Sequence, residues 1–413
     1  MSMYIDSLHV ENVGPFTKLD VQFNPKMNVI IGVNGIGKTS LLRCITNCLT
    51  QQYLENMRLR KDAMLKLNCV ENDQKIIYGA DKLVIKDQEY RHFSLNNWDL
   101  TVEPGYSKKL LFEDKNYNLL AIGAYRYFSY KKIEGMKRET LHLERRRNYI
   151  YNNPNYLEGT TMPDIKQWMI NRYFQIEKEW AIIERYNWDA IISKLQIIAP
   201  NESKFKFVKI GRDLEPVFSV NDNECYLEEL SSGFKSILSI VFMIVDWIEG
   251  INENDSAKID SAFGTVLIDE IDAHLHPTWQ ATILDSLRTL FPNLQFIVTT
   301  HSPNVIMSVK KGEVIVFNNN DGIVSLSPDN RAFGGWEVSS VLTDLMQAPG
   351  LNYVDITQKI KDINQAYEEN NLEKFKDLLN NLSDVLNPSD PIIKVYKIRL
   401  SELILRNDTD TED

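Results

Sequence analysis

The chain has 413 residues, of which 43% are hydrophobic and 25% charged, and its formal net charge is −11. This length and composition predict a globular protein with a sizeable core and room for two or three structural units. The acidic balance argues against a chain coated with nucleic acid along its length, but it leaves a local basic groove open.

Cysteine spacing and the distribution of apolar residues indicate a reducing compartment and no membrane partner. The four cysteines include no CxxC pair, so we expect neither a disulfide framework nor a zinc ribbon. The N-terminus lacks a basic segment followed by a long apolar run, and the most apolar stretch, Ile237 to Ile248, is too short to cross a bilayer. We therefore expect a cytoplasmic protein.

A phosphate-binding loop is predicted near the start of the chain. An apolar strand at Val29–Ile31 leads into GVNGIGKTS, residues 32–40, and then into an amphipathic helix, which is the strand–loop–helix context that GxxxxGK[ST] requires. Backbone N–H groups of such a loop surround phosphate oxygens, Lys38 reaches the β- and γ-phosphates, and the Thr39 hydroxyl coordinates Mg²⁺. The predicted nucleotide contacts are Gly32, Asn34, Gly35, Gly37, Lys38, Thr39 and Ser40.

Residues 131–204 are predicted to form a helical insert with a basic first part. Lysines and arginines alternate there with aromatic residues, a composition that suits phosphate contact and base stacking. A solvated helix face or a docking surface for an acidic partner explains the same charges. Long heptad runs are absent, which excludes a coiled-coil tether. The candidate contacts to DNA, RNA or a protein partner are Arg126, Arg145, Arg146 and Arg147.

The sequence LSSGFKS, residues 230–236, stands at the start of a strongly apolar helix. Ser231, Ser232 and Gly233 there favour an anion site, through capping side chains and exposed N–H groups. Taken alone, the same residues fit an ordinary helix N-cap equally well.

The stretch GTVLIDE, residues 264–270, predicts an apolar strand that ends in two carboxylates. Asp269 is suited to the Mg²⁺ shell, and Glu270 to orienting or deprotonating an attacking water. His274 and His276 follow, but a turn between strand and helix would splay their rings and no third nitrogen or sulfur ligand lies nearby, which argues against zinc.

A further buried strand, Phe296–Thr300, ends in His301. The carboxyl end of a strand beside the strand of Asp269 lies in the crevice where open α/β sheets bind ligands. We therefore expect His301 to reach a γ-phosphate. A capping or core histidine is the alternative.

The remaining sequence predicts a β-hairpin with its turn at residues 321–322, followed by helices from about Trp336. The apolar stripes of these helices fit an intramolecular core or, alternatively, a groove for a partner. The polar residues 407–413 are predicted to be disordered.

In order, GVNGIGKT, LSSGFKS, LIDEIDAHLH and VTTHS resemble the motifs of ABC-type ATPase heads of the SMC/RecF/OLD group. The resemblance implies an α/β fold with a two-lobed sheet core, ATP and Mg²⁺ as cofactors, and a homodimer in which Ser231, Ser232 and Gly233 cap the ATP of the second copy. It divides the chain into lobes at 1–130 and 205–335, the insert, a helical module at 336–406 and the tail.

Several positions depart from the pattern of that group. Ser232 stands where a glycine-type signature residue is usual, and His276 replaces an aspartate. After the predicted strand NLLAIGAY, no glutamine of a Q-loop is found where Tyr125 and Arg126 stand. These departures concern the interface between copies and the rate of hydrolysis.

The helical module lacks acidic nuclease motifs and looks like that of nuclease-less antiphage ATPases, such as PtuA-type ATPases of Septu and retron-associated ATPases. This resemblance implies a slowly hydrolysing dimer that controls a separate HNH-type nuclease through its nucleotide state. The alternative is a RecF-like DNA-repair ATPase that binds DNA without a nuclease partner, and neighbouring genes would discriminate the two. The length of the chain and its DEIDA sequence argue against the ATPase of a membrane transporter.

Overall fold

The computed structural model describes residues 3–50, 57–83, 106–108, 117–126, 130–199, 203–320, 323–336, 338–341, 345, 353–383 and 391–409. The chain divides into two compact units, Met1–Gln347 and Ala348–Asp413. Within the described residues, no helix is long and apolar enough to cross a membrane.

A six-stranded sheet in the order β14-β13-β3-β12-β11-β7 forms the centre of the first unit. Its strands are β3 (Met27–Ile31), β7 (Leu119–Ile122), β11 (Thr265–Ile268), β12 (Gln295–Thr299), β13 (Val314–Asn320) and β14 (Ile323–Asp329). All pairs of neighbouring strands are parallel except β13 with β14, which is antiparallel. Parallel strands bring the carboxyl ends of β3, β12 and β11 to one edge, and this edge carries the predicted nucleotide residues.

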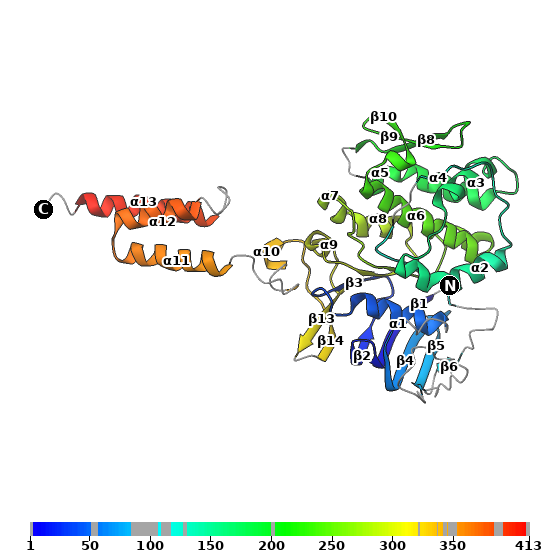
Figure 1. Ribbon diagram of the computed structural model, residues 1–413, viewed down its shortest axis with the longest axis horizontal. Helices are drawn as coiled ribbons and strands as arrows, with labels where there is room; N and C mark the ends of the chain where they lie inside the picture. The colour runs from blue at the N-terminus through cyan, green and yellow to red at the C-terminus, as the bar shows by residue number, and fades with distance from the viewer. Residues whose placement is uncertain are drawn as a thin grey trace. The chain divides into compact units, whose positions relative to one another are not determined.

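Both faces of this sheet are covered, which explains why its parallel strands are apolar without alternation. Successive side chains point to opposite faces, so that Val29 and Ile31 belong to one core and Ile30 to the other. Figure 1 shows α2 to α8, which belong to the core of Val29 and Ile31, on one side of the sheet. On the other side lie α1 and the strands β1, β2, β4 and β5, which belong to the core of Ile30. The predicted α/β fold with a P-loop sheet core is thus confirmed.

The remaining strands of the first unit form two smaller sheets. One has the order β2-β1-β4-β5-β6, with β1 (Met3–Val13), β2 (Phe16–Gln22), β4 (Leu59–Glu71), β5 (Gln74–Leu83) and β6 (Tyr106–Lys108). The other has the order β10-β9-β8, with β8 (Lys206–Ile210), β9 (Pro216–Val220) and β10 (Asn223–Tyr226).

The helices of the first unit connect and cover these sheets. They are α1 (Lys38–Thr50), α2 (His142–Glu158), α3 (Ile165–Gln175), α4 (Ile182–Ser193), α5 (Leu195–Ile198), α6 (Ser232–Ile251), α7 (Pro277–Gln280), α8 (Ile283–Leu290), α9 (Pro303–Met307) and α10 (Val338–Ser340). Short 3-10 turns lie at Leu227–Glu229 (η3) and Asn254–Ala257 (η4). The predicted hairpin of β13 and β14 pairs Asn320 with Ile323, and its turn, 321–322, lies outside the described residues.

The predicted helical insert begins with a non-helical segment. Residues 130–141 run beside α3, where the Asn171 side chain accepts from the N–H of Lys137 at 3.0 Å and donates to its C=O at 2.8 Å. The helices that follow, α3 and α4, are separated by a turn. The Arg185 side chain stabilises the turn between them by donating to the carbonyls of Ile176 and Lys178, at 2.6 and 3.0 Å.

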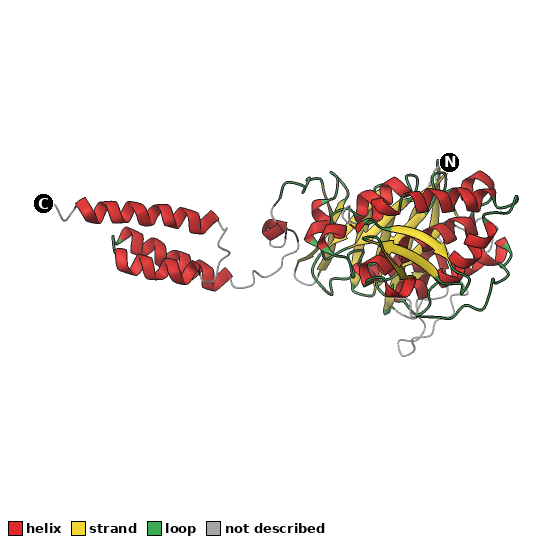
Figure 2. Cartoon of the chain, turned by 90° about the horizontal axis from the view of Figure 1, so that it is seen from above, coloured by secondary structure: helices red, strands yellow, loops and turns green. Residues whose placement is uncertain are grey.

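The second unit consists of three helices in its described part (Figure 2). They are α11 (Tyr353–Glu368), α12 (Leu372–Ser383) and α13 (Pro391–Thr409). Their apolar stripes meet in one core, formed by Ile363, Ala366, Phe375, Leu379, Leu382, Tyr396 and Leu403. The prediction of a disordered tail from residue 407 is wrong for 407–409, since an established helix extends by a few polar residues at little cost.

Candidate nucleotide-binding site

The P-loop connects β3 to α1 in a conformation that requires glycine. Gly37 has φ 117°, and a Cβ on Gly32 would lie 2.7 Å from the Cβ of Phe317. Asn34 and Gly35 are exposed at the tip of the loop, and Thr39 and Ser40 are half-buried at the start of α1. A loop of this kind between a strand and a helix can direct backbone N–H groups at a phosphate chain.

Lys38 lies under this loop, where it is 6% exposed. Its ammonium donates to the carbonyls of Gly32 at 2.9 Å and Val33 at 3.1 Å. Burial lowers the pKa of Lys38 to about 8, against the opposing effect of the nearby Asp269, Glu270 and Asp272 carboxylates. The ammonium is therefore held at the phosphate loop by weak neutral acceptors that an anion can replace.

The Asp269 carboxylate is fixed from both sides at the end of β11. Its Oδ2 accepts from the Thr39 hydroxyl at 2.8 Å, and its Oδ1 from the Thr299 hydroxyl at 2.6 Å. A hydroxyl and a carboxylate at this distance are hard oxygen donors of the kind that Mg²⁺ takes together with phosphate oxygens. The donor set of Thr39 and Asp269 thus fits the predicted metal.

Glu270 occupies a constrained turn directly after Asp269. Its φ of 46° lies in the left-handed region, which non-glycine residues rarely adopt. Its backbone N–H donates to the Thr299 hydroxyl at 2.8 Å, and its side chain is exposed at the site. Partial loss of hydration, followed by the charges of Asp269 and Asp272, raises the pKa of Glu270. A carboxylate with a raised pKa is a better proton acceptor.

Asp272 connects this turn to the end of the neighbouring strand β12. One of its oxygens accepts from the Thr300 hydroxyl at 2.6 Å and from the backbone N–H of His301 at 3.2 Å. Burial, followed by the charge of Lys38, lowers the pKa of His301. At neutral pH the half-buried imidazole is therefore uncharged and able to donate one hydrogen bond.

The predicted signature residues begin helix α6. Ser231 and Ser232 are exposed, and the Ser231 side chain makes no capping bond to the helix. Gly233 is buried against the Trp279 ring, and a Cβ there would lie 2.0 Å from that ring. Gly233 therefore permits close packing, and what it offers to an anion is its backbone N–H. His276 is the N-cap of α7, since its ring accepts from the N–H of Thr278 at 3.4 Å.

The four arginines of the predicted contact set do not share one surface. Arg126 is 1% exposed, which corrects its assignment as an exposed contact: the pairing of β7 with β11 places it beneath the Asp269–Glu270 backbone. The Arg145 side chain, 17% exposed, forms an ion pair with Asp246 at 2.7 Å. Arg146 is half-buried and Arg147 is exposed.

Several residues of the site were not predicted from the sequence. Thr299, Thr300 and Asp272 orient the carboxylates and His301 through the bonds described above. The two threonines at the end of the predicted strand Phe296–Thr300 were a usable signal, since buried hydroxyls there require partners. In the described part of the chain, no three His, Cys, Asp or Glu side chains converge as metal ligands.

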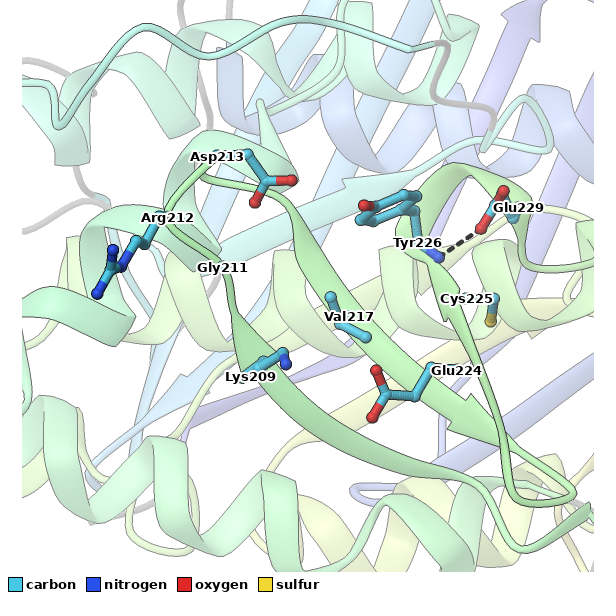
Figure 3. A pocket seen from close by; sticks show the side chains of 9 residues that line it. All are labelled: Lys209, Gly211, Arg212, Asp213, Val217, Glu224, Cys225, Tyr226 and Glu229. Atoms are coloured by element: carbon cyan, nitrogen blue, oxygen red, sulfur yellow. Dashed lines mark hydrogen bonds between the residues drawn. The ribbon is translucent and has the colours of Figure 1, made fainter.

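A separate cavity of about 590 Å³ lies on the sheet of β8 to β10 (Figure 3). Its charged side chains are of both signs, and the Glu229 carboxylate accepts from the backbone N–H of Tyr226 at 2.7 Å. The lining comprises Lys209, Gly211, Arg212, Asp213, Val217, Glu224, Cys225, Tyr226 and Glu229. None of these is a P-loop or β11 residue, so this cavity is distinct from the nucleotide site.

Comparison with known proteins identifies the family of the chain. The model of the AAA ATPase domain family matches residues 3–160 and 159–306. The chain belongs to this family. Membership in this family implies ATP hydrolysis.

Individual relatives cover different shares of the chain. It is 26% identical to the Septu protein PtuA of Bacillus thuringiensis, over 97% of this chain and 98% of that protein. It is 28% identical to the retron Ec83 probable ATPase of Escherichia coli, over 58% of this chain but 42% of that protein. Among solved structures, the SMC head domain from Thermotoga maritima matches 79% of this chain and 98% of its own, with 14% identity and a TM-score of 0.43.

Proposed function

We propose that this ATPase is the nucleotide-dependent subunit of an antiphage defence complex. In this proposal it works as an ATP-sandwiched homodimer and controls a separate HNH-type nuclease through its nucleotide state. The observation that carries the chemistry is the chain of bonds from Thr39 through Asp269 to Thr299, which holds beside the P-loop the carboxylate that we assign to Mg²⁺. The similarity to Septu and retron proteins supports the defence assignment.

Each residue has a distinct part in the proposed reaction. Lys38 and the P-loop N–H groups hold the β- and γ-phosphates, and Thr39 and Asp269 would hold Mg²⁺. Bound Mg²⁺ would neutralise charge on the phosphate oxygens. Glu270 orients a water molecule and takes its proton as the water oxygen attacks the γ-phosphorus, and His301 donates a hydrogen bond to a γ-phosphate oxygen. The products are ADP and inorganic phosphate.

The proposed dimer places the start of α6 against the nucleotide of the second copy. Ser231 and Ser232 are exposed at the N-terminus of this 20-residue helix, where free N–H groups and the helix dipole favour an anion. A γ-phosphate bound by both copies would favour the closed dimer, because a ligand shifts a protein toward the state that binds it better. Hydrolysis would remove that preference.

Glu270→Gln tests the assigned chemistry. The substitution removes the proton acceptor and leaves the phosphate loop intact, so we expect turnover to fall on the order of 10³-fold while the Kd for ATP stays within about threefold. Phosphate release and equilibrium nucleotide binding measure the two quantities. Hydrolysis at the wild-type rate would show that Glu270 is not the base.

The shared site is tested at Ser232 rather than at Gly233, because any side chain on Gly233 would strike Trp279 in its own subunit. Ser232→Arg adds bulk at an exposed position and should abolish nucleotide-dependent dimer formation. Mixing it with Lys38→Ala creates a dimer in which one site combines two intact halves, and we expect part of the activity to return. Unchanged hydrolysis by Ser232→Arg alone would contradict the composite site.

The partner assignment is tested by purifying the native complex from its host. Co-purification of an HNH-type nuclease, released or activated when the nucleotide changes, supports the defence subunit. Co-purification of DNA without a nuclease would instead favour a RecF-like repair ATPase.

A further inference from the structure

Arg126 is a buried cation whose surroundings are unusual. It follows β7, and the parallel pairing of Ile122 with Ile268 brings the chain leaving β7 beside the chain leaving β11. Withdrawing a guanidinium from water costs several kcal/mol unless it is well bonded. The groups that it contacts therefore indicate what it holds in place.

The bonds of Arg126 converge on the backbone that carries the site carboxylates. Its Nη1 donates to the carbonyls of Gly123 at 3.1 Å and Asp269 at 3.0 Å, and its Nη2 donates to the carbonyl of Glu270 at 2.7 Å. Its Nε donates to the Ser236 hydroxyl at 3.0 Å. A planar fork with donors in fixed directions matches two successive carbonyls, which a lysine cannot do.

These bonds clamp both peptide groups of Glu270. The N–H of Glu270 is held by the Thr299 hydroxyl, and its C=O is held by Arg126. Between the two bonds the backbone has a φ of 46°, a conformation that costs free energy and persists only where the surroundings impose it. Without Arg126, the Glu270 carbonyl would keep the N–H of Ala273 as a donor, at 2.8 Å, but it would lose its charged donor, so that the turn could relax.

The fourth bond of Arg126 reaches the signature helix. Ser236 lies one turn inside the N-terminus of α6, and its hydroxyl also donates to the carbonyl of Ala273 at 3.2 Å. A movement of the start of α6 therefore displaces an acceptor of the same guanidinium that holds Glu270. Ser231 and Ser232 stand at that start.

We propose that Arg126 is a positioning residue that holds Glu270 in its hydrolytic orientation and couples it to the start of α6. The inference rests on the proposed function, in which Glu270 is the base and α6 meets the nucleotide of a second copy. Burial lowers the pKa of Arg126 to about 10, against the opposing charges of Asp272, Asp269 and Glu270, so the guanidinium stays charged at neutral pH.

Kinetics of Arg126→Ala, Arg126→Lys and Ser236→Ala test the proposal. Because a positioning residue acts on the reacting geometry, we expect Arg126→Ala to lower kcat about 100-fold while KM and the Kd for ATP stay within about threefold. Arg126→Lys keeps the charge but loses the fork, so it should restore part of kcat. Ser236→Ala should lower kcat severalfold, and adding it to Arg126→Ala should lower kcat no further. Lys376→Ala, at an exposed position of α12, is the control.

The outcomes separate this proposal from a purely structural role and from the proposed function itself. A wild-type kcat in Arg126→Ala, with Glu270→Gln inactive, would overturn the positioning role alone. Wild-type activity in Glu270→Gln would overturn the proposed function first. If Arg126→Ala does not fold, Ser236→Ala and Arg126→Lys decide, because equal loss of ATP binding and turnover in both would show that Arg126 only supports the fold.

Discussion

Two charged segments stand out in this chain, the turn 269–272 and the basic segment 137–147, and the fold treats them differently. In the turn, the Asp269 and Asp272 carboxylates are bonded to groups at the end of β12. In the basic segment, Arg145 is paired with Asp246 whereas Arg147 is exposed. Parallel strands gather the residues that follow them at one edge, but successive helical residues point about 100° apart. Charged side chains that follow parallel strands therefore lie close together, whereas successive charged side chains of a helix lie on different faces.

The largest expected effect is on ATP turnover and comes from a substitution in the turn 269–272, where we expect the charged residues to act in the reaction. Asp269→Asn keeps the shape of the side chain but removes the charge that Mg²⁺ requires, so ATP turnover should fall on the order of 10³-fold. Asp377→Asn on the exposed face of α12 is the matched control. Phosphate release at saturating ATP and Mg²⁺ measures the effect, and an Asp269→Asn protein with more than a tenth of wild-type turnover would remove Asp269 from the metal site.

The second prediction compares the contributions of two arginines of the basic segment to stability. Arg145→Glu places a carboxylate beside Asp246 in a largely buried site, so the free energy of unfolding should fall by about 3 kcal/mol. Arg147→Glu, two residues away and exposed, should change it by less than about 0.5 kcal/mol. Chemical denaturation followed by tryptophan fluorescence compares the two. Equal destabilisation by the two substitutions would show that Arg145 and Arg147 do not differ in their contribution to stability.

The difference between the two segments also explains what could be predicted from the sequence. The P-loop, the Asp269–Glu270 pair and the position of His301 depend on local strand and helix patterns, and the structure places all of them at one edge. Arg126 was misassigned because its burial depends on carbonyls that lie 143 and 144 residues further along the chain. Counting charges cannot reveal such acceptors, since every residue carries a carbonyl.

Apart from the expected pairing of β12 with β11, the strand order and the helix boundaries of the insert were likewise beyond local patterns. That β12 separates β3 from β11 is a property of long-range pairing. The turn between α3 and α4 depends on the Arg185 side chain bonding back to Ile176 and Lys178. The helices of the second unit were easier to predict from the sequence, because each apolar stripe repeats within one helix.

A third prediction concerns the pH dependence of ATP affinity, because burial lowers the pKa of Lys38 in the site. Lys38 has a pKa of about 8 in the nucleotide-free protein, and an ATP anion favours its charged form, so the pKa rises on binding. The contribution of Lys38 to ATP affinity should therefore be constant well below pH 8, and ATP affinity should fall by up to about tenfold per pH unit above it. Lys38→Arg does not titrate in this range and should bind more weakly but with a flat profile. An ATP affinity independent of pH up to 9.5 in the wild-type protein would contradict this assignment.

The smallest expected effect concerns nucleic acid at the exposed part of the basic segment. Arg145 holds the fold, so the test reverses Arg146 and Arg147 alone. If they contact phosphates, affinity for DNA or RNA should fall about fivefold, and each lost contact should lower the slope of log K against log[salt] by roughly 0.7–0.9. The control, Lys361→Glu with Lys376→Glu on exposed positions of the second unit, changes the net charge equally. If both double variants lose the same affinity, the effect is one of overall charge, which an acidic chain makes more severe. If neither loses affinity but the Arg146–Arg147 variant loses its protein partner in co-purification, the surface docks an acidic protein instead.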